Sequence, residues 1–218
     1  MIEHGIQLDH EREARLGFDE AIYAAGKSVV QIEAIVAEAV EARSPRLFTR
    51  LDAFKFDALP AAARAALDFD PVSRTAFLGD RMRKAAAAQV AIVTGGSSDL
   101  PVSREAARTL EYYGHECLHI ADVGVAGIWR LLARVAELRP MKVVIAVAGM
   151  EGALPSVVGG LVPGVVIALP TSVGYGVSEG GRVALDSALA SCAPGLVTVN
   201  IDNGYGAACA ALRILRAS

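Results

Sequence analysis

The chain has 218 residues, and 53% of them are hydrophobic, which is enough for one large core or for an ordinary core with a smaller one. The formal net charge of −3 argues against a general nucleic-acid binder, and no run approaches the roughly 20 apolar residues of a membrane span. Because the first residues are charged and contain no apolar signal core, we expect a cytoplasmic protein that binds neither nucleic acid nor membrane.

Residues 1–86 are charged and helix-forming, and we interpret them as a small, mainly helical N-terminal region. One helix is expected around 9–26 and another near 29–42, followed by a less regular stretch to residue 80. Arg12, Arg15 and Lys27 have spacings compatible with a basic helix face and its end. The ordinary interpretation of such a face is a solvated surface, because long charged side chains usually face water.

Residues 87–218 alternate apolar runs with helices and glycine-rich loops. Five apolar runs are expected to be buried strands, over 89–94, 117–120, 141–147, 165–169 and 196–201. One helix is expected to end at Tyr113, with Ser98 or Asp99 as its N-cap and Pro101 in its first turn. Others are expected over 128–138, from Ala153, and up to Arg216 at the end of the chain.

Strands that are apolar throughout and alternate with helices specify a parallel sheet covered on both faces. With right-handed crossovers this is a three-layer, doubly wound α/β domain of flavodoxin-like type, preceded by the helical region. Ligands bind such sheets beyond the carboxyl ends of the strands. The loops after the first, third, fourth and fifth strands are rich in glycine and polar residues, so we expect the functional site there.

The cysteines and histidines give no metal or disulfide signature. Cys117, Cys192 and Cys209 are an odd number without CxxC spacing, which argues against a disulfide framework and a zinc site. His115 and His119 have helical i, i+4 spacing, but they flank a segment that we interpret as a strand. We therefore predict no metal-ligating residues.

Several motifs occur in order along the chain. The first region holds 8–18 (LDHEREARLGF), with Ile22-Tyr23 and Gly26-Lys27; the second holds 96–102 (GSSDLPV), 122–127 (DVGVAG), 147–156 (VAGMEGALPS), 170–176 (PTSVGYG), 191–193 (SCA) and 200–204 (NIDNG). Together they resemble the AIR carboxylase (PurE-like) superfamily. Within it they are most similar to the LarB family of pyridinium-3,5-biscarboxylic acid mononucleotide synthases. The resemblance covers essentially the whole chain.

The resemblance implies an enzyme of nickel-pincer nucleotide biosynthesis, the pathway of lactate racemase maturation. Its reaction is carboxylation of C5 of the pyridinium ring of nicotinic acid adenine dinucleotide (NaAD) with CO2 or bicarbonate. Hydrolysis of the phosphoanhydride then gives pyridinium-3,5-biscarboxylic acid mononucleotide and AMP. The sequence requires no cofactor and leaves open whether Mg²⁺ assists hydrolysis. The resemblance also implies a homo-oligomer, an octamer with active sites between subunits.

The resemblance makes Cys192 the covalent nucleophile and Glu151 the base. From the residues alone, a buried, inert thiol at the end of a helix is the favoured interpretation of Cys192, and Cys117 and Cys209 are packing residues. Partial burial after an apolar strand would raise the pKa of Glu151 and make it a better base. The alternative for Glu151 is a carboxylate that caps the helix from Ala153.

The remaining candidates would bind substrate. The loop of Gly96, Ser97, Ser98 and Asp99 is expected to bind a phosphate or ribose, because small residues before a helix expose N–H groups. The other candidates are Asp122, Met150, Gly152, Ser172, Tyr175 and Asp202 in the strand-end loops, with Arg12, Arg15 and Lys27 for the diphosphate or ring carboxylate. For Asp202 a role in forming the Asp-Asn-Gly turn is the alternative.

Two alternative functions are also compatible with the sequence. Purine-pathway mutases or carboxylases acting on an aminoimidazole ribonucleotide share the 96–102 type of loop, but they use histidines from two other loops. Here those loops carry 122–127 (DVGVAG) and 152–155 (GALP), without histidine. Proton transfer through histidine is therefore not available. The second alternative is a non-catalytic nucleotide-binding protein.

Overall fold

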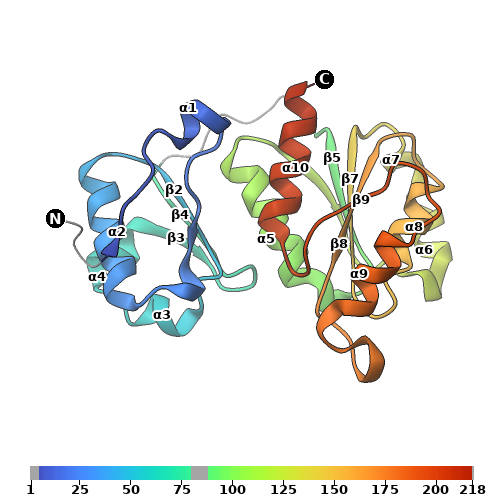
Figure 1. Ribbon diagram of the computed structural model, residues 1–218, viewed down its shortest axis with the longest axis horizontal. Helices are drawn as coiled ribbons and strands as arrows, with labels where there is room; N and C mark the ends of the chain where they lie inside the picture. Colours follow the sequence, from blue (N-terminus) through green and yellow to red (C-terminus); the bar gives the residue numbers. More distant parts are fainter. Residues whose placement is uncertain (1–4, 80–87, 218) are drawn as a thin grey trace. The chain divides into compact units, whose positions relative to one another are not determined.

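The computed structural model describes residues 5–79 and 88–217. The chain divides into unit 1 (Met1–Met82) and unit 2 (Arg83–Ser218), which run from blue to teal and from green to red in Figure 1. The domain boundary predicted at residues 86 and 87 lies outside the described residues.

Unit 1 combines helices with a four-stranded sheet. Its strands are β1 (Ile22–Tyr23), β2 (Arg46–Thr49), β3 (Leu67–Asp70) and β4 (Thr75–Leu78), in the order β1-β2-β4-β3. β1 is parallel to β2, and the other pairs are antiparallel. The helices are α1 (Arg12–Leu16), η2 (Ala24–Gly26, a 3-10 helix), α2 (Val29–Glu41), α3 (Ala53–Asp57) and α4 (Ala61–Ala66). Ser28 begins α2 through a capping box with Gln31, and the helix buries Ile32 and Ile35 in the core of the unit.

The helix predicted over 9–26 is wrong. α1 ends at Leu16, because Gly17 adopts a left-handed conformation (φ 74°) and its N–H bonds to the carbonyl of Glu13. The chain then extends into β1, where Ile22 is buried in the core. The helix predicted near 29–42 is confirmed by α2, whereas β2, β3 and β4 lie in the stretch that was expected to be irregular.

Unit 2 is the predicted doubly wound α/β domain. Its parallel strands are β5 (Val90–Thr94), β6 (Cys117–Ile120), β7 (Val143–Ala148), β8 (Val165–Pro170) and β9 (Val197–Thr198), in the order β6-β5-β7-β8-β9. The helices are η3 (Ser97–Asp99), α5 (Leu100–Tyr112), η4 (Val125–Gly127), α6 (Ile128–Leu132), α7 (Val135–Leu138), α8 (Leu154–Gly159), η5 (Gly176–Gly181), α9 (Arg182–Leu189) and α10 (Gly204–Ala217).

The sheet of unit 2 is covered on both faces, which explains its continuous apolar strands. Every residue of β5 and β7 is buried. Figure 1 shows α5 and α10 together on one face, where α10 packs against α5, β7 and β8. On the other face Leu131 of α6, Leu138 of α7 and Leu154 of α8 share one apolar core with the sheet. The three-layer prediction is confirmed.

Two local predictions in unit 2 are wrong, and the predicted N-cap at Asp99 is confirmed by position. The helix over 128–138 is two short helices, α6 and α7. The fifth strand pairs with β8 only at Val197 and Thr198, not over 196–201. Asp99 precedes α5 as predicted, but no side chain caps this helix, because the Asp99 carboxylate is bonded elsewhere. Within the described residues, none of the helices has the length and apolar character needed to span a membrane.

Candidate functional site at the carboxyl ends of the strands

A cavity of about 590 Å³ opens in unit 2 beyond the carboxyl ends of β5, β6, β7 and β8. It is lined by residues from 95–99, 124–130, 148–154 and 173–175. Among the residues predicted from the sequence, it brings together Gly96, Ser98, Asp99, Met150, Glu151 and Tyr175. The site therefore lies where a doubly wound sheet binds its ligands.

Close approaches between the loop backbones shape this cavity. A Cβ atom at Gly149 would overlap with the carbonyl oxygen of Val173, and one at Gly124 would overlap with that of Gly95. Met150, between these loops, has a left-handed backbone (φ 52°), which costs energy for a residue with a side chain. Glycine is therefore required where the loops cross, because a larger residue would push them apart.

Asp99 places a buried carboxylate beside the first loop. Its side chain accepts hydrogen bonds from the Gly96 N–H (2.9 Å) and the Thr171 hydroxyl (2.7 Å). Burial raises the pKa of Asp99 above its ordinary value, and these two hydrogen bonds oppose the rise. The Asp99 carboxylate therefore occupies the Gly96 N–H, which is not available to a phosphate.

Glu151 lies between β7 and α8, and its side chain is exposed at the cavity. The partial burial expected from its position after an apolar strand is therefore wrong. The alternative interpretation as a helix cap is not supported either, because α8 has Ala153 as its N-cap and no side-chain cap hydrogen bond. An exposed carboxylate on a cavity wall is available to take up a proton from a bound substrate.

Four predicted residues lie in the loops without lining the cavity. Asp202 joins two loops, since its carboxylate accepts the Ser172 N–H (2.8 Å) and its N–H donates to the Pro170 carbonyl (2.9 Å). Its left-handed backbone (φ 55°) fits the predicted turn. Gly152 (φ 64°) packs against α9, where a Cβ would lie 2.8 Å from the Ala184 Cα. Ser97 is exposed in η3.

Asp122 and Arg130 form an ion pair next to the cavity. The carboxylate of Asp122 lies 2.5 Å from Nη1 of Arg130, and its N–H donates to the Thr94 hydroxyl (3.0 Å). Arg130 lines the cavity and is the only lysine or arginine among the described lining residues. Sequence reasoning did not single it out, because one arginine in an expected helix has the pattern of a surface residue. The preceding glycine-containing motif, 122–127, was the available signal.

Cys192 is exposed and does not belong to the described lining of the cavity. It follows α9 in a segment that is fastened to α8, because the hydroxyls of Ser191 and Ser156 lie 2.7 Å apart. α8 is also the helix that begins three residues after Glu151. The structure therefore places the two predicted catalytic groups at one helix but does not bring them into one cavity. The interpretation of Cys192 as a buried thiol is wrong.

Arg12, Arg15 and Lys27 lie in unit 1, but the single helix that was expected to carry the two arginines and to end near Lys27 is interrupted. Arg12 and Arg15 lie on α1, but Lys27 follows η2. Arg15 forms an ion pair with Asp9 (2.6 Å), whose hydrogen bond lowers the pKa of that carboxyl group. Lys27 is held by its backbone, since its carbonyl accepts a hydrogen bond from Lys55 Nζ (2.8 Å).

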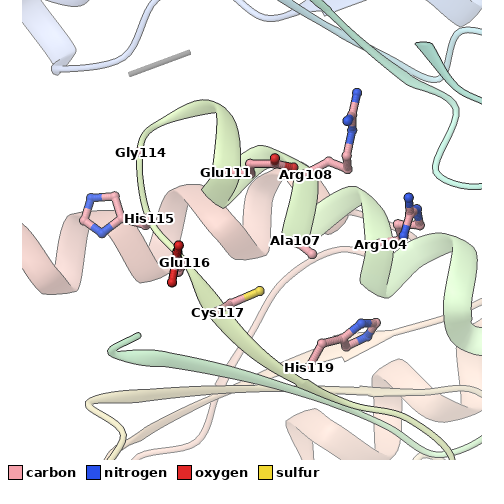
Figure 2. A pocket seen from close by; sticks show the side chains of 9 residues that line it. All are labelled: Arg104, Ala107, Arg108, Glu111, Gly114, His115, Glu116, Cys117 and His119. Atoms are coloured by element: carbon pink, nitrogen blue, oxygen red, sulfur yellow. The ribbon is translucent and has the colours of Figure 1, made fainter. Parts of the chain in front are cut away.

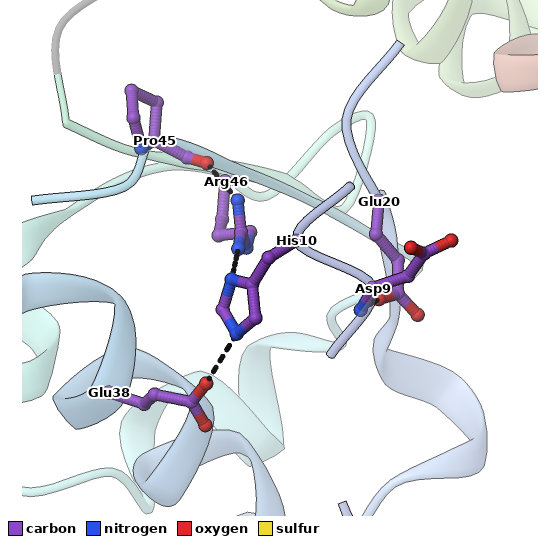
Figure 3. Close-up of polar contacts among 6 residues, drawn as sticks. All are labelled: Asp9, His10, Glu20, Glu38, Pro45 and Arg46. Carbon is purple, nitrogen blue, oxygen red and sulfur yellow. Dashed lines mark hydrogen bonds and ion pairs between the residues drawn. The ribbon is translucent and has the colours of Figure 1, made fainter. Parts of the chain in front are cut away.

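A polar network in unit 1 holds the segment that precedes α1. Figure 3 shows His10 between Arg46 and Glu38. The ring atom Nδ1 lies 3.4 Å from Arg46 Nη2, and Nε2 lies 3.2 Å from the Glu38 carboxylate. Arg46, on β2, is only 4% exposed and also donates to the Pro45 carbonyl (2.9 Å). The network ties this segment to α2 and β2.

A second cavity, of about 440 Å³, lies between α5 and β6 on unit 2. Figure 2 shows its charged lining, with Arg104 and Arg108 from α5 above Cys117 and His119 of β6. Burial, assisted by nearby Glu111, raises the pKa of Cys117 to about 11. Its thiol is therefore protonated at neutral pH, as expected for a packing residue. Cys209, on α10, is partly buried.

Across residues 5–79 and 88–217, no three His, Cys, Asp or Glu side chains are grouped in a way that could hold a metal ion. The strand-end cavity is instead built from glycine backbone, two carboxylates and one guanidinium.

The sheet order and the cavity at its carboxyl edge define a flavodoxin-like α/β protein with its ligand site at the strand ends. Two protein families match the chain: LarB/PurE-like N-terminal domain over residues 4–81, and AIR carboxylase over residues 89–218. The chain belongs to the AIR carboxylase (PurE) superfamily as a LarB-like member.

The chain is also similar to individual proteins. An uncharacterized protein of Methanocaldococcus jannaschii, MJ0165, is 36% identical over 94% of this chain and 82% of its own length. The N5-carboxyaminoimidazole ribonucleotide mutase of Pyrococcus horikoshii is 38% identical, over 58% of this chain and 71% of the mutase. The crystal structure of a single-substitution variant of Treponema denticola PurE2 has a TM-score of 0.50 and 27% identity, covering 62% of this chain and 82% of that one.

Proposed function

We propose that this protein carboxylates C5 of the pyridinium ring of NaAD with CO2 or bicarbonate and hydrolyses the phosphoanhydride. The products are pyridinium-3,5-biscarboxylic acid mononucleotide and AMP. The observation that carries the proposal is the strand-end cavity with Glu151 on its wall, in a chain that also has the LarB/PurE-like N-terminal domain. As a LarB-like protein it would act in nickel-pincer nucleotide biosynthesis, in the cytoplasm.

The chemistry requires one thiolate and one carboxylate. A pyridinium ring is electron-poor, so its C5 does not attack CO2 unaided. Addition of the Cys192 thiolate at C4 gives a dihydropyridine that is an enamine at C5, which then forms the new bond to CO2. Glu151 removes the C5 proton, and expulsion of the thiolate restores the aromatic ring. No electrons are gained or lost overall, so the step requires no oxidant.

In this mechanism the Cys192 thiolate has to reach the substrate in the cavity. Since the thiol lies outside the cavity in the described chain, the adduct requires either movement of the segment around Cys192 or a thiol from another copy. A homo-oligomer, an octamer by family resemblance, would provide the second route. The short pairing of β9 with β8, at Val197 and Thr198, favours the first.

The mutase function is less well supported by the same cavity. Of the described residues that line it, none is a histidine. Glu151 and Asp99 are its acid–base groups, and Arg130 is its cation. Conversion of an aminoimidazole ribonucleotide by the purified protein would establish the mutase function instead.

The test uses the full chain, NaAD and isotopically labelled bicarbonate, with products and intact protein followed by mass spectrometry. We expect labelled dicarboxylate mononucleotide and AMP from the wild type, and neither from Cys192→Ser. Cys209→Ser is the matched control, because this thiol lies on α10 and away from the lining of the cavity. If the folded wild-type protein binds NaAD but releases no AMP and incorporates no label, the proposal fails.

A further inference from the structure

We propose that Arg130 binds an oxyanion of the substrate, either the ring carboxylate or the ribose phosphate, and so selects anionic pyridine nucleotides. This inference rests on the proposed function, because it assigns a substrate group to the same cavity. It adds a specificity-determining residue that the sequence motifs did not indicate.

Two carboxylates line the cavity, so an anionic substrate requires a cation beside it. Glu151 and Asp99 both present carboxylates there, and the ligand would carry at least one further negative charge. Among the described lining residues only Arg130 offers a positive side chain. A guanidinium binds carboxylate and phosphate groups through charge-assisted hydrogen bonds. An anionic ligand would therefore be attracted to the Arg130 side of the cavity.

The guanidinium is held in place and only partly used. Nη1 binds the carboxylate of Asp122, at 2.5 Å. Nε is buried and has no hydrogen-bond partner in the described structure. A buried donor without a partner costs free energy, so part of the hydrogen-bonding capacity of the guanidinium is unused. Arg130 is therefore oriented by Asp122 and left with capacity for one more acceptor, while its side chain remains 31% exposed.

The preceding loop is shaped around this side chain. A Cβ at Gly127 would lie 2.8 Å from Nε and 3.1 Å from Nη2 of Arg130. The backbone of Gly127 (φ −121°, ψ 55°) is not in the left-handed region, so a Cβ there would displace the Arg130 guanidinium without straining the backbone. Asp122, at the other end of the loop, has a left-handed backbone (φ 58°) and is anchored to Thr94. Both features serve the placement of Arg130.

The experiment measures binding by isothermal titration calorimetry, independently of turnover. The probes are NaAD, its carboxamide counterpart NAD, nicotinic acid mononucleotide and the corresponding riboside. We expect Arg130→Gln to weaken NaAD binding by about 10- to 100-fold, the loss typical of a charge-assisted hydrogen bond. Gly127→Ala should weaken it in the same direction. Arg134→Gln is the matched control, because Arg134 pairs with Glu137 and does not line the cavity.

The probes identify the oxyanion. If the difference between wild type and Arg130→Gln disappears with NAD, Arg130 binds the ring carboxylate. If it persists with NAD and disappears with the riboside, Arg130 binds the phosphate. Equal NaAD affinity of the wild type and a folded Arg130→Gln overturns this inference, even if labelled bicarbonate is incorporated. An Arg130-dependent affinity without carboxylation overturns the proposed reaction and leaves the inference standing.

Discussion

The two cavities of unit 2 are lined by different kinds of chemical group. The strand-end cavity is formed by glycine backbone and strained loops, and it contains few charged groups. The cavity between α5 and β6 is lined by charged side chains on regular structure, as Figure 2 shows. The first requires specific residues in order to exist at all. In the second, the charged groups lie on α5 and in the segment just before β6.

Because of this difference, we expect substitutions in the two cavities to affect different properties, catalysis in one and stability in the other. Substitutions that keep the shape of the strand-end cavity should change chemistry without changing the fold. Substitutions at the α5–β6 cavity should change stability or its pH dependence without changing chemistry. The same residue type placed in each cavity gives the sharpest contrast.

The largest expected effect is on catalysis at Glu151. Glu151→Gln should lower the rate of carboxylation by about 100- to 10 000-fold, the usual contribution of a general base. Its stability should stay near that of the wild type, because the side chain is exposed and does not cap α8. Product formation by mass spectrometry and urea unfolding provide the two measurements. Glu116→Gln, at an exposed carboxylate of the other cavity, should leave the rate of carboxylation unchanged, and a comparable rate loss there would abolish the contrast.

A smaller effect, on stability, is expected where the loops cross. Gly149→Ala should lower the free energy of unfolding by about 1–3 kcal/mol, because the new Cβ would overlap with Val173 O and force the loops apart. Gly160→Ala is the control, since its Cβ would meet Val157 O at an ordinary 3.5 Å. Urea unfolding of both variants checks this. Equal stability of the two would show that the crossing is not tight.

The smallest effect is a pH dependence at the α5–β6 cavity. Burial, with a contribution from Arg104, lowers the pKa of His119 below its ordinary 6.5. The unfolded chain therefore binds the proton more readily, so the stabilisation is complete above about pH 6.5 and is lost as pH falls through the lowered pKa.

Urea unfolding between pH 8 and pH 5 tests this in the wild type and His119→Gln. The variant also lacks the contact between His119 Nε2 and the Ser103 hydroxyl (3.0 Å). We expect this loss to lower its free energy of unfolding by the same amount at every pH. The wild type should lose more stability than the variant as pH falls, with carboxylation unaffected. A stability difference that does not change with pH would contradict the prediction.

The sequence predicted unit 2 well because burial on both faces leaves a strong signal. The strands from β5 to β8 were found within one or two residues at their ends, since β5, β7 and β8 are almost entirely apolar and β6 has one polar residue, His119. β9 was overestimated because its neighbours are apolar but do not pair. Helix 128–138 was expected to be continuous, and the break after α6 has no glycine or proline to announce it.

Unit 1 was harder to predict because its helices and strands are short and several of its charged side chains pair with one another. β2 and β4 are four-residue strands buried along their whole length, without the alternation of a half-buried strand. Gly17 was available as a helix terminator, but the charged pattern around it favoured a continuous helix. At the site, sequence motifs located the loops. Arg130 required the structure, because its role depends on Asp122 and Gly127 in three dimensions.

The two-residue pairing of β9 also has a kinetic consequence. An edge strand with so short a ladder opens at lower free energy than the centre of its sheet. Backbone amides around Cys192 should therefore exchange with deuterated water well before those of β7, which pairs on both sides along its length. We therefore expect the segment that carries the thiol to open more readily than the centre of the sheet.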